Sequence, residues 1–262
     1  KPEVVAGIPI VQAAMGTDQV GRFDIMVDTD NNCIDSYTWN LIPIDEDHCP
    51  RDIELEKVIQ KYKDQTDSKY CRVVTRFADR YTHPARNQET LLGKLLADAF
   101  KDVLGVDIMF LGSGSIRDEE LGPIVQYRDL LQVFPYNDEI YRICVTGEQL
   151  RRMVKRILRN EGDHAEYYQF SRGFRIEFNQ KEQELISLSF NGYEVRDNDQ
   201  YKLGLQSFHL KNIQDFLDVS LEEVTAIKRP KIISTKSTDV LEEYFSQYEL
   251  IRVSNEQRLI LR

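Results

Sequence analysis

The chain has 262 residues, 41% hydrophobic and 30% charged, which is enough for one large globular domain or two unequal ones. Its formal net charge of −10 argues against a general binder of nucleic acid or anionic membranes, although a local basic pocket can still hold a small anion. No apolar run approaches the roughly 18 residues that a membrane-spanning helix needs.

The first part of the chain, residues 1–43, predicts short strands. Residues 8–12 form one strand, and residues 21–28 and 34–41 flank a polar turn, which favours a hairpin. These strands have no helix nearby to cover them, so we expect them to complete a sheet whose other strands lie elsewhere. The chain begins at Lys1 without an initiator Met or a signal peptide, and we expect it to be a piece of a longer protein.

An acidic segment flanked by prolines follows at residues 43–50 and is typical of a linker. Residues 52–64 then carry apolar side chains at helical spacing, which predicts a helix. We therefore divide the chain into strands at 1–43, a linker with its helix at 44–65, and a second domain at 66–262.

The second domain alternates helical and strand patterns. Its apolar runs predict strands at residues 71–77, 106–111, 140–145, 173–178, 185–190, 201–206 and 259–261. Helices are predicted at residues 87–104, 127–131, 147–159 and 239–248. Asn87 is the expected N-cap of the first helix, and Asn191 with Gly192 predicts a hairpin turn. This mixed order predicts an α+β domain with a mixed sheet and flanking helices.

Two features of the chain do not require a functional explanation. The helix after the capping box of Thr146 and Gln149 has a basic outer face, which we interpret as solvated, with a partner surface as the alternative. The four cysteines lie far apart and form no Cys-x-x-Cys pair: Cys33, Cys49, Cys71 and Cys144. We interpret them as ordinary thiols, which favours a cytoplasmic location slightly over an exported or cell-surface one.

The histidines show no spacing that is typical of a metal site: His48, His83, His164 and His209. We therefore expect no metal ion or other cofactor in this chain. His209 is interpreted as a buried or exposed bystander rather than as a catalytic group.

The best candidate for a binding site lies in residues 106–137. An apolar strand ends at Gly112, and the turn after it contains Gly114 and leads to Arg117. Glycine allows positive φ and close approach, and an arginine beside exposed N–H groups suits phosphate or carboxylate. The aromatic pair Phe134 and Tyr136 follows and supplies an aromatic platform for a nucleotide. The alternative is a strand, a glycine turn and a surface arginine, since such short motifs often occur by chance.

Four segments carry motifs in a shared order and at shared intervals: RNQETLLGKLLADA from Arg86, GSGSIR at 112–117, PYN at 135–137 and VTGEQL at 145–150. They resemble, in turn, the E-x-x-x-G-x-x-x-x-D-A helix, the NGGGIR turn, the PFGN segment and the VTG step of the C-terminal domain of the 5'-nucleotidase family. The resemblance extends over residues 66–216.

Residues 7–24 are similar to the end of that family's N-terminal metallophosphoesterase domain, whose pattern G-x-P-I-V-Q-A…G-R-x-D recurs here. The resemblance implies that residues 1–43 are the last strands of a truncated metallophosphoesterase sandwich. It also implies that two divalent metal ions and the catalytic residues belong to the rest of that domain, where two-metal phosphoryl transfer takes place. This chain alone is then expected to be inactive.

The resemblance further implies a substrate pocket with two arginines and two aromatic rings. Arg86 and Arg117 are expected to contact charged oxygens of the substrate, and Tyr136 and Phe208 to sandwich the base. The alternatives are surface arginines and core aromatic residues. The candidate substrate-binding residues are Arg86, Gly112, Gly114, Arg117, Tyr136, Asn137, Phe208, Gln214 and Asp215.

Two departures from the family leave the substrate open. Gly112 stands where the family has asparagine, and Gln214 or Asp215 is the candidate replacement for a ribose-binding aspartate. A 5'-nucleotide, a 2',3'-cyclic nucleotide and a nucleotide sugar all remain possible. The expected partners are such a phosphate ester and the N-terminal metallophosphoesterase domain, not a nucleic-acid polymer. The alternative function is a non-catalytic nucleotide-binding or interaction module that keeps the fold.

Overall fold

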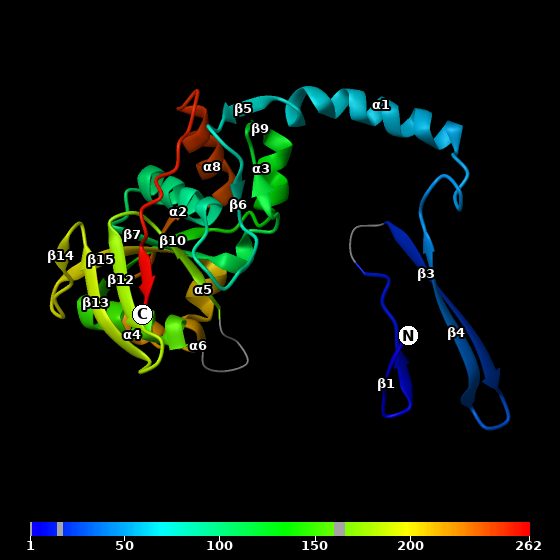
Figure 1. Cartoon of the computed structure of the whole chain (residues 1–262), viewed down its shortest axis with the longest axis horizontal. Helices are drawn as coiled ribbons and strands as arrows, with labels where there is room; N and C mark the ends of the chain where they lie inside the picture. The colour runs from blue at the N-terminus through cyan, green and yellow to red at the C-terminus, as the bar shows by residue number, and fades with distance from the viewer. Residues whose placement is uncertain (1, 15–17, 160–165) are drawn as a thin grey trace. The chain divides into compact units, whose positions relative to one another are not determined.

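The computed structural model of the chain describes residues 2–14, 18–159 and 166–262 (Figure 1). The chain divides into two compact units, Lys1–Thr66 and Asp67–Arg262. Among the described residues, no helix combines the length and the apolar character that crossing a membrane requires.

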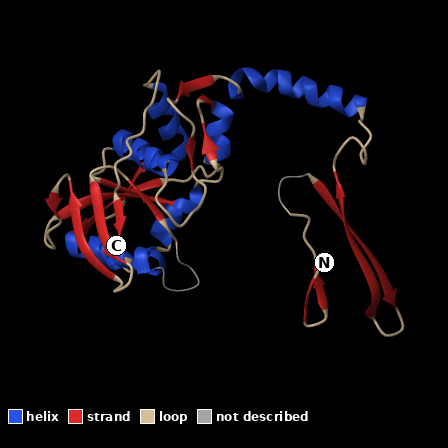
Figure 2. Cartoon of the chain, viewed as in Figure 1, coloured by secondary structure: helices blue, strands red, loops and turns tan. Residues whose placement is uncertain are grey.

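The first unit contains two β-hairpins, drawn as pairs of red arrows in Figure 2. Strands β1 (Glu3–Val5) and β2 (Ile8–Ile10) form the short one, and β3 (Gln19–Asp28) and β4 (Cys33–Pro43) form the long one. The predicted hairpin is therefore confirmed. Its turn is closed by the Asp28 carboxylate, which accepts hydrogen bonds from the two backbone N–H groups at positions 30 and 31 at 2.9 and 3.1 Å.

None of the described residues of the first unit is buried. Ile8 is 67% exposed and Met26 is 64% exposed, although both belong to strands. The ring of Phe23 packs on those of Tyr37 and Trp39, but this cluster does not amount to a core. Paired strands with exposed apolar faces are typical of a sheet that lacks its covering layer. That another part of a longer protein covers them remains a prediction.

Helix α1 (Ile53–Tyr70) is longer than the predicted helix at 52–64 and has no buried residue. It begins after Asp52, whose carboxylate accepts a hydrogen bond from the N–H of Leu55 at 3.0 Å and so acts as a cap.

The second unit is built on a five-stranded sheet with the order β11-β7-β15-β10-β16. Strand β7 (Ile108–Gly112) runs parallel to β15 (Gln200–Gln206), and β11 (Tyr168–Phe170) pairs with β7 in the antiparallel sense. Strand β10 (Ile140–Thr146) is antiparallel to both β15 and β16 (Lys231–Ser234). The sheet is mixed, as predicted.

A second sheet has the order β14-β13-β12-β17. Strands β12 (Phe174–Asn179), β13 (Glu184–Phe190) and β14 (Tyr193–Glu194) follow one another antiparallel, and β17 (Leu259–Leu261) lies parallel to β12. The turn between β13 and β14 has positive φ at Asn191 and Gly192, 51° and 82°, which confirms the predicted hairpin turn.

Alternation along β7 divides the apolar interior of the unit in two. Met109 and Leu111 belong to the cluster that packs against α2 (Leu91–Leu104) and α8 (Ser237–Ser246). Ile108 and Phe110 point to the opposite face and belong to the cluster around α4 (Gly147–Arg159). In Figure 1, α2 and α4 accordingly lie on opposite sides of the central sheet.

Shorter elements complete the unit. They are β5 (Val73–Arg76), β6 (Tyr81–Thr82), β8 (Glu120–Leu121), β9 (Ile124–Gln126), α3 (Tyr127–Val133), α5 (Ser207–Lys211), α6 (Ile213–Leu217), α7 (Leu221–Ile227) and the 3₁₀ turn η1 (Ser113–Ser115). The mixed sheet with helices on its faces confirms the predicted α+β fold.

The N-cap predicted for α2 is wrong. Thr90, not Asn87, caps the helix: its Oγ1 accepts a hydrogen bond from the N–H of Gly93 at 3.0 Å. The N–H of Thr90 donates in turn to Oε1 of Gln169 at 3.1 Å, so a distant strand fixes where the helix begins. The helix ends at Leu104, as predicted, and Gly105 follows it with a φ of 61°.

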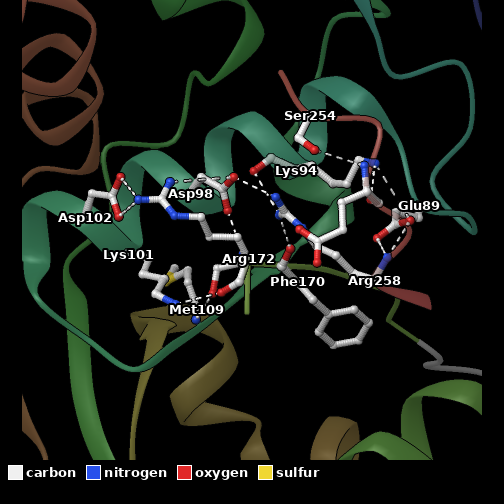
Figure 3. Close-up of polar contacts among 12 residues, drawn as sticks. Glu89, Lys94, Asp98, Lys101, Asp102, Met109, Phe170, Arg172, Ser254 and Arg258 are labelled. Atoms are coloured by element: carbon white, nitrogen blue, oxygen red, sulfur yellow. Dashed lines mark hydrogen bonds and ion pairs between the residues drawn. The ribbon is translucent and has the colours of Figure 1, made fainter. Parts of the chain in front are cut away.

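A buried ionic cluster ties the last strand to the first helix of the unit (Figure 3). Arg258 is 2% exposed; its Nη2 lies 2.6 Å from Oδ2 of Asp98, and its Nη1 donates to the Phe170 carbonyl at 2.7 Å. Asp98 also accepts from the backbone N–H of Arg172 at 2.7 Å. The charges of Arg258 and Asp98 thus meet each other, which is the condition for keeping charged groups in a core, while Nε of Arg258 has no hydrogen-bond partner among the described residues.

Candidate functional site

A cavity of about 340 Å³ opens beside the C-terminal end of β7. Its walls come from the loop before α2, the η1 turn, the segment after α3, the segment before β11 and helix α5. The lining residues are Arg86, Gly114, Ser115, Arg117, Tyr136, Asp138, Glu166, Phe208 and His209. Five of them were predicted from the sequence, and the fold brings them together from positions up to 122 residues apart.

The glycines of the η1 turn serve close approach rather than positive φ. Gly112 has a φ of −56°, and neither it nor Gly114 is among the positive-φ residues of the described chain, so that prediction is wrong. A Cβ at position 112 would lie 2.1 Å from Nε2 of His209, and one at position 114 would lie 3.2 Å from Oε1 of Glu166. Gly112 does not line the cavity but abuts His209, which does.

The two arginines of the cavity are not neutralised by ion pairs. Within the described ranges, neither Arg86 nor Arg117 lies within 4.0 Å of a carboxylate oxygen. The Arg117 guanidinium lies 5.8 Å from the ring centroid of Tyr136, which is a cation–π distance. Its Nη1 donates a long bond of 3.4 Å to the Gly114 carbonyl. Arg86 precedes α2 rather than opening it, because Thr90 caps the helix.

The aromatic residues of the cavity are surface residues. Tyr136 is 43% exposed and Phe208 is 53% exposed, so the alternative in which both belong to the core does not hold. The Phe208 ring is supported from below by His209 and Phe216, at centroid distances of 5.4 and 5.7 Å. Exposed, supported rings of this kind offer flat faces to a planar ligand.

His209 is buried at the base of the cavity. Its Nδ1 lies 2.9 Å from the Tyr168 hydroxyl, and the two rings meet edge to face. Burial lowers the pKa of His209 to about 4, so the imidazole is neutral at pH 7. From the sequence we interpreted His209 as a bystander. The one sequence signal for its role was the glycine at position 112, which leaves room for the imidazole ring.

Glu166 is the second ionisable group that the sequence missed. Its Oε1 accepts a hydrogen bond from the N–H of Gly114 at 3.0 Å. Burial raises its pKa, while the Gly114 hydrogen bond and the positive charge of Arg86 act in the opposite direction. Asp138 adds another carboxyl group to the wall. Neither acid belongs to a motif in the sequence.

A hydrogen-bonded layer behind the cavity holds the turn in place. The buried ring of His83 has Nδ1 2.8 Å from Thr90 Oγ1 and Nε2 3.2 Å from the Ser113 carbonyl. Nε2 of Gln169 donates to Ser113 Oγ at 3.0 Å. Burial lowers the pKa of His83, so it too acts as a neutral hydrogen-bonding group.

Asn137 has a structural position rather than a place in the cavity wall. Its Oδ1 accepts from Oγ1 and the backbone N–H of Thr238, at 2.9 and 3.4 Å, in the first turn of α8. The asparagine therefore fixes the segment that carries Tyr136.

Gln214 and Asp215 do not line this cavity. They lie in α6, beside a second cavity of about 400 Å³ whose other lining residues are Arg152, Lys155, Arg156, Arg159 and Asp218. Nε of Arg156 donates to the Asp215 carbonyl at 3.1 Å, so part of the basic face of α4 is used inside the fold. The structure thus separates the two candidate ribose-binding residues from the arginines and the rings.

The described residues do not supply a metal site. Across residues 2–14, 18–159 and 166–262, no three His, Cys, Asp or Glu side chains are placed to share an ion. All four cysteines are free; Cys33 and Cys49 are exposed. His164 lies outside the described residues. The described side chains therefore have no group that would hold the two metal ions that the family resemblance implies.

The chain is similar to a known family and to several known proteins. The profile of the family "5'-nucleotidase, C-terminal domain" matches residues 67–218. Endonuclease YhcR of Bacillus subtilis is 24% identical over 152 residues, covering 57% of this chain and 12% of that protein. A 5'-nucleotidase of Vibrio cholerae is 22% identical over 228 residues, covering 80% of this chain and 40% of that protein. The chain thus spans less than half of either relative.

A solved structure shows the same fold. The 5'-nucleotidase precursor from Thermus thermophilus superposes with a TM-score of 0.71 at 14% identity, covering 99% of this chain and 54% of that one. At this identity the likeness concerns the fold alone. The profile, in contrast, matches more than half of the chain and includes the η1 turn and the rings of the cavity. The chain therefore belongs to the family of the 5'-nucleotidase C-terminal domain.

Proposed function

We propose that this chain is the substrate-binding part of a larger, metal-dependent phosphohydrolase that acts on nucleotides. The observation that carries the proposal is one cavity in which two arginines, without ion-pair partners among the described residues, lie beside two exposed aromatic rings. Such a cavity suits a ligand with an anionic group and a planar ring, and a nucleotide has both. Nucleotide breakdown is the process this activity would serve.

Each side chain has a distinct role in the proposed complex. Arg86 and Arg117 bind phosphate oxygens, each charge-assisted hydrogen bond contributing about 1.5–3 kcal/mol. Tyr136 and Phe208 stack on the base and add about 1–3 kcal/mol per ring. Lost freedom of the ligand costs several kcal/mol, so the isolated chain binds in roughly the micromolar to millimolar range. The hydrolytic step and its two divalent ions belong to the N-terminal metallophosphoesterase domain of the longer protein.

Calorimetric titration of the chain with AMP, adenosine and CMP tests the proposal. Arg86→Ala and Arg117→Ala are each expected to weaken AMP about tenfold or more, and adenosine much less, because adenosine has no phosphate. Arg80→Ala is the matched control, since Arg80 pairs with Glu120 at 2.7 Å outside the cavity. If no nucleotide or nucleoside binds even at millimolar concentration, the proposal is wrong.

The second candidate is a nucleotide-binding module without catalysis. It is favoured by one observation: the family's asparagine is replaced by Gly112, and the space is filled by His209. Phosphate release by the full-length protein with added Mn²⁺ or Zn²⁺ separates the two candidates. Metal-dependent release excludes the module, and binding without release supports it. In either case the 262-residue chain alone is expected to release none.

A further inference from the structure

The cavity contains two carboxyl groups that phosphate binding and base stacking do not use, Glu166 and Asp138. A carboxylate beside bound phosphate is unfavourable unless the ligand also presents a hydrogen-bond donor to it. A nucleotide has two kinds of such donor, the hydroxyl groups of its sugar and the N–H groups of its base. The position of each carboxyl group decides which kind it meets.

Glu166 is held in one place by the glycine turn. The N–H of Gly114 donates to Oε1 at 3.0 Å, and a Cβ at position 114 would lie 3.2 Å from Oε1 and 3.5 Å from Oε2. Among the described contacts, Oε2 has no hydrogen-bond partner. One oxygen is therefore anchored, and the other remains available to a ligand.

Glu166 lies near Arg86, one of the two arginines that line the cavity. Arg86 is close enough for its charge to act on Glu166, but the two form no ion pair within 4.0 Å in the described part of the chain. Asp138, in contrast, follows Tyr136 by two positions and so belongs to the segment that carries a ring. In any nucleotide the sugar lies between the phosphate and the base.

We propose that the second oxygen of the Glu166 carboxylate accepts a hydrogen bond from the 2'-hydroxyl of a ribonucleotide, so that the cavity selects ribose over 2'-deoxyribose. This inference rests on the proposed function. The placement of Gln214 and Asp215 supports it, because both line another cavity and neither lines this one. Glu166 is then the specificity-determining residue for the sugar, with no role in breaking the phosphate ester.

The test compares AMP with 2'-deoxy-AMP by calorimetric titration of the whole chain. The wild type is expected to prefer AMP by about tenfold, the value of one hydrogen bond to a charged group. Glu166→Ala is expected to abolish the preference by weakening AMP while leaving 2'-deoxy-AMP within about twofold. Glu166→Gln keeps an acceptor for the Gly114 N–H and is expected to reduce the preference. Asp138→Asn, the matched control, is expected to retain it.

The outcomes separate the sugar inference from the proposed function. Binding of both nucleotides with equal affinity by the wild type overturns the inference and leaves the proposed function intact. Failure of both to bind overturns both. An equal loss for AMP and 2'-deoxy-AMP in Glu166→Ala shows a merely structural role, and loss of the preference in Asp138→Asn alone assigns the sugar to Asp138; either result contradicts the inference. A thermal melt of each variant verifies folding.

Discussion

The imidazole of His209 occupies the space that a side chain on residue 112 would need. A Cβ built on Gly112 lies 2.1 Å from Nε2 and 2.4 Å from Cε1 of that ring. The ring has little room to withdraw, because its Nδ1 lies 2.9 Å from the Tyr168 hydroxyl and the residue is 2% exposed. Gly112, which departs from the family pattern, and the buried His209 therefore depend on each other: the ring fits only because residue 112 has no side chain.

This relationship predicts coupled stabilities at positions 112 and 209. Gly112→Asn is expected to destabilise the second unit by about 1–3 kcal/mol through overpacking. In a His209→Ala background the same change should cost less, with a coupling of about 0.5–3 kcal/mol. Urea unfolding of the wild type, the two single variants and the double variant measures it. Gly114→Ala is the control, because its Cβ would meet only the Glu166 carboxyl group, at 3.2 Å or more. Additive changes in unfolding free energy for Gly112→Asn and His209→Ala would show that the His209 ring moves freely.

The buried histidines predict that stability falls in mild acid. The folded pKa of His209 is about 4 and its ordinary value is 6.5, so the unfolded chain binds this proton more readily. The contribution of neutral His209 to the free energy of unfolding is complete above the ordinary pKa. It is lost as pH falls from 6.5 toward 4, by about 3 kcal/mol in total. His209→Gln should flatten this slope in urea unfolding measured across that range. His83, whose pKa is also lowered, leaves a residual slope of the same sign.

The ionic cluster in Figure 3 predicts a large asymmetry between single and double substitution. Arg258→Met removes the nearer of the two cations beside Asp98, leaving Nη1 of Arg172 at 3.9 Å, and is expected to cost up to about 3–5 kcal/mol. Asp98→Leu combined with Arg258→Met should recover most of that loss. Arg262→Ala is the control: its pair with Glu177, at 3.1 Å, leaves the arginine 64% exposed, and its loss should cost less than about 1 kcal/mol. A double variant as unstable as the single one would argue against this account.

Arg117 and Tyr136 are predicted to affect the salt dependence of AMP binding differently. Arg117→Ala should weaken AMP binding and reduce its sensitivity to salt, because a screened charge has been removed. Tyr136→Ala should weaken binding by about tenfold and leave the salt slope unchanged, since stacking is not screened. Titrations at two salt concentrations measure both slopes. Identical slopes for the two variants would contradict the assignment of phosphate to Arg117.

The first unit predicts weak protection from hydrogen exchange. Strands β3 and β4 are paired, but none of their residues is buried, whereas α2 has nine buried residues. Local opening therefore costs less in the hairpin, and its amide protons should exchange before those of α2. Exchange followed by mass spectrometry tests this in the intact chain. Equal protection of both segments would mean that the hairpin is covered, for instance by a second copy of the chain.

Regular elements were predictable because their periodicity is local. The last strand was predicted at residues 259–261 and is found there as β17, and the capping box of Thr146 forms both of its hydrogen bonds with Gln149. The start of α2 was not predictable, because Asn87 and Thr90 are both good caps. The choice between them depends on Gln169, which is distant in sequence.

The cavity was predicted in part, for a related reason. Residues within motifs, such as Arg117, were found because their neighbours mark them. Glu166 and Asp138 are single acids from irregular segments, and nothing local distinguishes them from other surface carboxylates. The direction of Gln214 depends on α6, a helix of five residues, which is too short to leave a periodic signal.

The link between Asp98 and Arg258 also constrains how the protein is made. The two residues are 160 positions apart, and at about 5–20 residues per second the ribosome needs roughly 10–30 s to travel from one to the other. By the end of that interval the nascent polypeptide contains α2 and β12, but it still lacks both the guanidinium of Arg258 and the edge strand β17. The second unit can therefore close only near the end of its translation. Until then its apolar surfaces depend on the exit tunnel and on chaperones for protection.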